Sequence, residues 1–269
     1  MTVVIEPPRG WLRIPWRELW EFRDLWWMLS LQQIQVRYRQ AVLGGMWALI
    51  QPVAAAAAFS IIFRELIGET HGIPYFLFAY SGTLLWTLVS STVSEGSISL
   101  LKNSLLLTKV YFPRLIMPLS TVGFSTLDLG VGLAVLGVIM GWYRVLPGLE
   151  VLIVPVVLVG TLVCALAVSV LLSALTVRFR DFRFVVPFGL QMWFFLSPVI
   201  YPVEVLGTGL QKIIAINPMV GWLSAFRACL FGSELDLVSL ALAAGVTLLL
   251  SVVALIYFRQ VEGTFSDIV

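Results

Sequence analysis

The sequence has little charge for its size. Only 12% of its 269 residues are Asp, Glu, Lys or Arg, whereas soluble domains carry about 25%, and 59% are hydrophobic. A soluble chain of this composition could not cover its surface with polar groups, and its mean hydropathy is +0.97. The composition excludes a soluble enzyme and predicts a chain that is solvated mainly by lipid. A net charge of only +2 gives no indication of nucleic-acid binding.

Residues that support catalysis or metal binding are also scarce. The chain has one histidine, His71, and its two cysteines, Cys164 and Cys229, lie in separate hydrophobic segments without disulfide or metal-site spacing. None of its three lysines follows the glycine-rich motif of a phosphate-binding loop. We therefore predict that the chain catalyses no bond chemistry and binds no metal, ATP or other cofactor itself.

Long apolar runs predict an all-α polytopic membrane protein. Crossing about 30 Å of hydrocarbon takes about 20 mostly apolar helical residues, and helices satisfy their own backbone hydrogen bonds. Six runs meet this requirement: 41–63, 75–94, 115–143, 151–177, 184–203 and 237–258.

The distribution of Lys and Arg predicts the orientation of these spans. Thirteen of the 17 Lys and Arg residues fall on the side that holds the N-terminus, 1–40, and the C-terminal tail, 259–269. Positive charge accumulates on the cytoplasmic side of membrane proteins. Both termini are therefore expected in the cytoplasm, after six crossings.

Two further segments are expected at the membrane surfaces. The apolar part of 204–235 is interrupted by Asn217-Pro218 and carries Arg227, which predicts short re-entrant or interfacial helices on the outer face. Segment 14–30 mixes tryptophans with charged residues, which is typical of an amphipathic helix in the interface. The alternative for 14–30 is a water-facing helix packed on a soluble partner.

Buried acids and outer aromatics each allow two interpretations. Asp128 lies near the centre of the third predicted span and Glu95 at the inner end of the second, where either could belong to a polar path. Asp128 could equally make a helix-packing hydrogen bond or be protonated. The aromatics of the outer half could stack on sugars or anchor the chain in the interface; they include Phe59, Trp86, Trp193 and Tyr201.

Five segments resemble, in order and spacing, the ABC-2 type permeases that export polysaccharides. They are 31–52 (LQQIQVRYRQAVLGGMWALIQP), 107–120 (LTKVYFPRLIMPLS), 177–202 (VRFRDFRFVVPFGLQMWFFLSPVIYP), 217–227 (NPMVGWLSAFR) and 258–269 (FRQVEGTFSDIV). Any one motif alone would be weak, but their combination from about residue 30 to the C-terminus is specific. A small departure is Ala41, where a serine is common.

The resemblance implies the transmembrane subunit of an exporter of lipid-linked O-antigen, capsular polysaccharide or teichoic acid in the inner (plasma) membrane. Two copies would form the channel as a homodimer, and two separate ATPase subunits would bind ATP and Mg. By this likeness 1–40 holds a cytoplasmic gate helix, 41–258 is the six-span domain and 259–269 is a cytoplasmic tail.

The resemblance also implies roles for particular residues. The segment 97–112 would be a coupling helix that contacts the ATPase through Lys102, Asn103, Ser104, Leu107, Thr108 and Lys109. At the inner headgroups, a lipid pyrophosphate or the lipid itself would be bound by Arg37, Tyr38 and Arg39. Aromatics such as Phe59, Trp86, Trp193 and Tyr201 would line the channel, whose outer mouth would be closed by Asn217, Pro218 and Arg227.

Other functions remain open at this stage. The same fold could export a drug, a lipid or another small hydrophobe. A polytopic enzyme acting on lipid-linked sugars should show clustered acids or a histidine at one interface, and His71 stands alone on the outer side. An ATP-independent channel would not need a cytoplasmic coupling segment.

Overall fold

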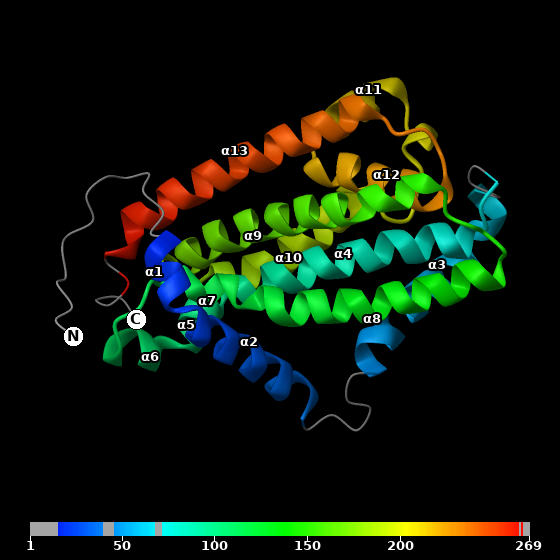
Figure 1. Cartoon of the computed structure of the whole chain (residues 1–269). Coiled ribbons are helices and arrows are strands. Elements are labelled where there is room, and N and C mark those ends of the chain that lie inside the picture. The colour runs from blue at the N-terminus through cyan, green and yellow to red at the C-terminus, as the bar shows by residue number, and fades with distance from the viewer. Residues whose placement is uncertain (1–15, 40–45, 68–71, 264, 266–269) are drawn as a thin grey trace.

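The described part of the chain is a bundle of helices (Figure 1). The computed structural model describes residues 16–39, 46–67, 72–263 and 265, and within these ranges no β-sheet forms. The helices are α1 (Trp16–Glu21), α2 (Arg23–Tyr38), α3 (Trp47–Ile67), α4 (Tyr75–Ser97), α5 (Ser99–Lys102), α6 (Ser104–Lys109), α7 (Ile116–Leu119), α8 (Thr121–Trp142), η2 (Leu149–Ile153), α9 (Val154–Arg178), α10 (Phe182–Leu196), η3 (Val203–Val205), α11 (Thr208–Ile214), α12 (Pro218–Phe231) and α13 (Leu237–Glu262). The expectation of an all-α polytopic chain is confirmed.

Four of the expected spans are helices long and apolar enough to cross a membrane: Tyr75–Ser97, Ile116–Trp142, Leu149–Arg178 and Leu237–Glu262. The apolar stretches of α3 and α10, Leu49–Phe63 and Phe182–Leu196, are shorter. Expected residues 41–45 lie outside the described ranges. Six crossings therefore remain a prediction.

The fifth expected span, 184–203, does not continue as a helix to its end. Helix α10 stops at Leu196, where Ser197 adopts an extended conformation with ψ 142°. Pro198 follows, and a residue before proline is disfavoured in the helical region. Residues 197–202 instead form an irregular turn that packs into the bundle.

The segment before the last span is a bent pair of helices. Helices α11 and α12 meet at 100° around Asn217. The Asn217 side chain accepts a hydrogen bond from the Met219 N–H, and Pro218 occupies the first turn, where its missing N–H costs nothing. Gly232 then ends α12 with a left-handed φ of 69°. The bend is as predicted, whereas its position relative to the membrane stays a prediction.

Helix α4 lies at the centre of the bundle. It packs against α3, α8 and α9 and also contacts α10 and α12, so most of its side chains are buried. Gly96 permits a close approach to α9, because a Cβ there would lie 3.1 Å from the Cβ of Ser169 and overlap its hydroxyl as placed. Small residues allow such close helix packing in membrane proteins.

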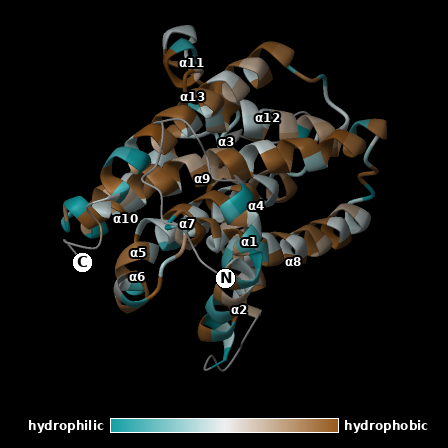
Figure 2. Ribbon diagram, turned by 60° about the vertical axis from the view of Figure 1, so that its left-hand side comes forward, coloured by the Kyte–Doolittle hydropathy of each residue, from teal (hydrophilic) through white to brown (hydrophobic). Residues whose placement is uncertain are grey.

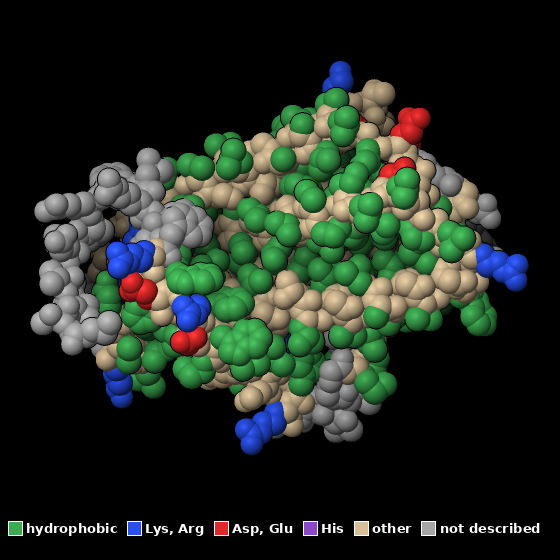
Figure 3. Space-filling model, viewed as in Figure 1, with side chains coloured by type: hydrophobic (Ala, Val, Ile, Leu, Met, Phe, Trp, Pro, Cys, Tyr) green, Lys and Arg blue, Asp and Glu red, His purple; other side chains and the backbone are tan. Residues whose placement is uncertain are grey.

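Most exposed charge lies toward the ends of the bundle, while Asp128 and Arg227 are buried within it. Figure 2 shows hydrophobic residues along α8, α9 and α13, with hydrophilic residues in α1 and α2 and toward the C-terminus. The face in Figure 3 is largely hydrophobic, and its charged groups lie mainly around its periphery. Exposed apolar residues on the long helices include Val138, Val159 and Leu248. This pattern is that of a protein surrounded by lipid.

Two predicted helices are each divided. The expected interfacial helix over 14–30 is two helices, α1 and α2, separated at Phe22, and α2 continues to Tyr38. The expected single coupling helix over 97–112 is α5 and α6, because Asn103 between them leaves the helical conformation with φ −111° and ψ 29°. The prediction of one continuous coupling helix is thus corrected.

Candidate functional site

Helix α2 is attached to α7 and α8 by polar contacts along one face. The Trp26 indole N–H donates to the Leu119 carbonyl at 2.9 Å, and the Ser30 hydroxyl donates to the Ser120 carbonyl at 2.9 Å. One turn further, the Gln33 amide donates to the Ser120 hydroxyl at 2.8 Å. Spacings of three and four residues place these groups on the same side of α2. The amphipathic helix is therefore a fixed part of the bundle in this structure.

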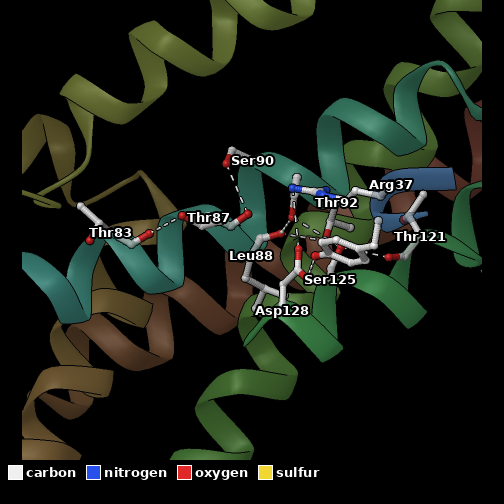
Figure 4. Close-up of polar contacts among 11 residues, drawn as sticks. Arg37, Thr83, Thr87, Leu88, Ser90, Thr92, Thr121, Ser125 and Asp128 are labelled. Atoms are coloured by element: carbon white, nitrogen blue, oxygen red, sulfur yellow. Dashed lines mark hydrogen bonds and ion pairs between the residues drawn. The ribbon is translucent and has the colours of Figure 1, made fainter. Parts of the chain in front are cut away.

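The C-terminal end of α2 meets a buried carboxylate on α8. The Tyr38 hydroxyl donates a hydrogen bond to Asp128, and the Arg37 guanidinium lies 3.7 Å from the other carboxylate oxygen (Figure 4). Arg37 also lies over the Phe124 ring, 5.2 Å from its centroid. Burial, and then the hydrogen bond to Asp128, raise the pKa of Tyr38 above its usual value.

These contacts bear on two of the sequence predictions. Asp128 makes the helix-packing hydrogen bond that was one of its two interpretations, and it is only 6% exposed. Arg37 and Tyr38 are brought together at Asp128, whereas Arg39 is exposed and separate from them. Their binding of a pyrophosphate or headgroup stays a prediction.

A cavity of about 650 Å³ with both polar and apolar walls lies beside this contact. Helix α2 forms one wall, α4 and α5 form another, and α10 contributes Pro187 and Leu190. Its polar lining consists of Gln32, Gln33, Arg37, Gln51, Thr87, Ser90, Ser91, Ser94, Glu95, Ser99, Lys102 and Asn103.

Most of these cavity residues were missed by the sequence interpretation. The usable signal was the row Thr87, Ser90, Ser91 and Ser94, which recurs at helical spacing within a predicted span. Among the residues that the structure describes, no cluster could hold a metal ion.

The predicted coupling residues do not all face outward. Lys102 forms an ion pair with Glu95 at 2.6 Å, and the Asn103 amide donates to the Ser99 carbonyl at 2.9 Å. Lys109 is exposed and Ser104 is half-buried, while nothing is described of the Thr108 side chain.

Leu107 requires a correction within this segment. It is 6% exposed because it packs into the apolar cluster between α2, α9 and α13, so it cannot face a partner in this structure. The outward apolar residues are instead Leu105, Val110 and Tyr111, which are 72%, 51% and 60% exposed. Sequence reasoning had not selected any of these three.

The predicted channel aromatics contact one another or the backbone. The Trp86 ring makes edge contacts with Trp193 and Phe194, each at 5.6 Å between centroids, and Phe194 stacks on Phe59 at 5.9 Å. Tyr201 lies apart and donates its hydroxyl hydrogen to the Phe195 carbonyl at 2.9 Å. In the single chain Trp86 is 8% exposed, so this cluster joins α3, α4 and α10.

Two of the residues predicted for the outer gate, Asn217 and Pro218, lie at the bend between α11 and α12, and Asn217 is bonded to the turn after α10. The Trp193 indole donates to the Asn217 side chain at 2.9 Å, and Asn217 donates to the Ser197 hydroxyl at 2.9 Å. Pro218 begins α12 and is buried.

Arg227, on α12, is buried against the turn that follows α10. Its guanidinium donates to the carbonyls of Pro198 at 2.7 Å, Val199 at 2.6 Å and Phe78 at 3.2 Å, and it lies 3.5 Å from the centroid of the Phe78 ring. In this structure Arg227 therefore fixes the turn after α10. Its gating role stays a prediction.

Several long apolar helices with exposed apolar side chains, and exposed charge mostly toward the ends of the bundle, define a multi-pass helical membrane protein. The chain belongs to the ABC-2 type transporter family, whose sequence profile matches residues 24–231. Membership identifies it as a membrane subunit of a transporter that works with a partner ATPase.

The chain is also similar over nearly its whole length to curated permeases. It is 29% identical to the O-antigen export system permease protein RfbA of Myxococcus xanthus, covering 93% of this chain and 97% of that protein. A permease of the same name from Klebsiella pneumoniae is 25% identical, covering 91% of this chain and 95% of that protein.

Proposed function

We propose that this chain is the membrane subunit of an ATP-driven exporter that moves a lipid-linked polysaccharide across the inner (plasma) membrane. The observation that carries the proposal is similarity to O-antigen export permeases over more than nine-tenths of this chain. The exported polymer would be of O-antigen, capsular or teichoic-acid type.

In the proposed assembly two copies of the chain form the path and two ATPase subunits bind ATP and Mg. Both termini and the α5–α6 segment face the cytoplasm, six segments cross the membrane, and α11–α12 re-enters from outside. The aromatic residues Phe59, Trp86, Trp193 and Tyr201 would face the path, and Asn217, Pro218 and Arg227 would stabilise its outer end. The carrier headgroups would lie beyond the cavity, at the C-terminal end of α2 near Arg37, Tyr38 and the exposed Arg39.

Coupling to the ATPase is assigned to the α5–α6 segment. Its outward apolar residue Leu105 and the exposed Lys109 offer a contact surface, with Lys102, Asn103 and Ser104 in the same segment. Nucleotide binding shifts the conformation only as far as it favours one state over the other, so this contact must differ between states.

Co-purification with the candidate ATPase in lipid, followed by measurement of ATP turnover, tests the proposal. A stable complex with two copies of each subunit is expected. The double variant Leu105→Asp/Lys109→Ala should lower turnover about tenfold, the effect of ~1.4 kcal/mol, while the control Lys212→Ala, on the exposed surface of α11, should not. Failure to form a complex with any ATPase would overturn the proposal.

A further inference from the structure

The cavity beside α4 has a wall of hydroxyl groups. Thr87, Ser90, Ser91 and Ser94 line it from successive turns of the helix. The first three donate their hydroxyl hydrogens to carbonyls of α4 itself, at 2.7, 3.3 and 3.2 Å. A hydroxyl oxygen that has donated its hydrogen can still accept a hydrogen bond. This wall therefore offers a row of acceptors.

Amide groups complete the lining. Gln32 of α2 and Gln51 of α3 border the cavity, and their side chains make no hydrogen bond to any residue that the structure describes. Each amide supplies two donors and an acceptor. A ligand whose groups both donate and accept hydrogen bonds, such as a sugar with hydroxyls on its edge, can use these polar groups, whereas an acyl chain would leave them without partners.

The charges that line the cavity are already neutralised. Arg37 is paired with Asp128 at 3.7 Å, and Lys102 with Glu95 at 2.6 Å. A diphosphate is bound most strongly by arginine or lysine free to form charge-assisted hydrogen bonds. A diphosphate would compete with the Asp128 and Glu95 carboxylates for these two cations, while an uncharged ligand leaves both ion pairs intact.

We propose that this cavity binds an uncharged, hydroxyl-rich stretch of the glycan rather than the diphosphate of its lipid carrier. Its volume of about 650 Å³ lies within the range of small-ligand sites. The apolar side chains of Pro187 and Leu190 line the same cavity and provide a surface for the C–H face of a sugar ring. The inference rests on the proposed function, because it names the part of that substrate which this site holds.

Photocrosslinking in cells that make the polymer tests the assignment. The photoreactive residue p-benzoylphenylalanine replaces Gln32 or Gln51, and, as a matched control, Leu248 on the exposed face of α13. After irradiation, the protein is probed for attached glycan before and after mild acid, which splits the glycosyl–diphosphate bond. We expect glycan adducts at both cavity positions that survive the acid, and none at position 248.

Two results would overturn the inference. One is an adduct that loses its glycan in acid, because the photoreactive group is then attached to a C–H of the lipid carrier, on the far side of the glycosyl–diphosphate bond. The other is no adduct at either cavity position while surface polymer is still exported. If neither photoreactive variant folds, Gln32→Leu and Gln51→Leu decide instead: each should lower surface polymer about tenfold at equal protein level, and unchanged export would refute the assignment.

Failure of the proposed function gives a different result from failure of this inference. A strain that lacks the chain is compared with one that carries it before any adduct is scored. Surface polymer that does not depend on the chain refutes the proposed function. Polymer that depends on the chain, combined with acid-labile adducts, refutes only the assignment of the cavity.

Discussion

At the residue scale, the Asp128 carboxylate connects the amphipathic helix α2 to the membrane bundle. It is buried, accepts the Tyr38 hydrogen bond and pairs with Arg37. A buried carboxylate requires such partners because its desolvation is costly. Replacing Asp128 with asparagine keeps the shape of the side chain but removes its charge, which weakens the contacts with Tyr38 and Arg37.

Asp128→Asn should therefore destabilise the protein. Hydrogen bonds to charged groups contribute about 1.5–3 kcal/mol, so the melting temperature in detergent should fall by several degrees, at about 2–4 °C per kcal/mol. The control is Thr126→Ala on the same helix, whose exposed hydroxyl bonds only to its own helix at 2.6 Å. Equal melting temperatures for the two variants would contradict the role given to Asp128.

The N-cap of the last span predicts a pH dependence. Asp236 accepts hydrogen bonds from the Ser239 hydroxyl and from the N–H groups of Ser239 and Val238, and the hydroxyl contact contributes most to lowering its pKa. Because the folded pKa lies below the unfolded one, the stabilisation is present above about pH 4 and is lost as pH falls through the folded value.

Asp236→Ala should lower the melting temperature at pH 7, since losing a helix cap costs about 1 kcal/mol. Melting curves of both proteins at a series of pH values from 7 to 3 measure the difference. The difference in melting temperature between the wild type and Asp236→Ala should become smaller toward pH 3. A gap that stays constant over this range would show that the charge of Asp236 is irrelevant to the cap.

At the element scale, close packing of α12 on α13 depends on Gly221. An added Cβ would lie 2.2 Å from the backbone carbonyl oxygen of Ser239, whereas a Cβ at Gly130 on α8 would meet nothing within 4 Å. Overpacking costs about 1–3 kcal/mol, while alanine favours a helix over glycine by ~1 kcal/mol. The two glycines should therefore respond in opposite directions.

Gly221→Ala should lower the melting temperature, and Gly130→Ala should leave it unchanged or raise it. If Gly221→Ala is as stable as Gly130→Ala, α12 and α13 are not packed as closely as the structure has them.

At the scale of the whole molecule, the charge distribution predicts which ends face the cytoplasm. Cysteine introduced at Lys102 or Arg180 should be protected from a membrane-impermeant maleimide in intact cells, and cysteine at Lys212 or Glu234 should be labelled. The native cysteines are buried and give little background. Labelling of both sets only after the cells are opened would contradict the six-span orientation.

The sequence by itself determined the class of the protein and the place of its helices. Low charge and apolar runs require lipid and helical backbone, and the Asn217-Pro218 pair was sufficient to locate the bend between α11 and α12. These features are local, because they depend on composition and on groups a few residues apart. Span lengths were less well predicted, since α10 ends early where Ser197 and Pro198 leave the helix.

Only the tertiary structure decided which polar groups meet. Tyr38 and Asp128 are 90 positions apart, and the cavity combines side chains from α2, α3, α4, α5 and α10. Leu105 and Leu107 both lie in α6, and two positions along a helix differ by about 200° in direction, so the packing of α6 decides that Leu107 points into the bundle and Leu105 out of it. Contacts of this kind depend on how helices are placed against one another, and hydrophobic periodicity does not encode that placement.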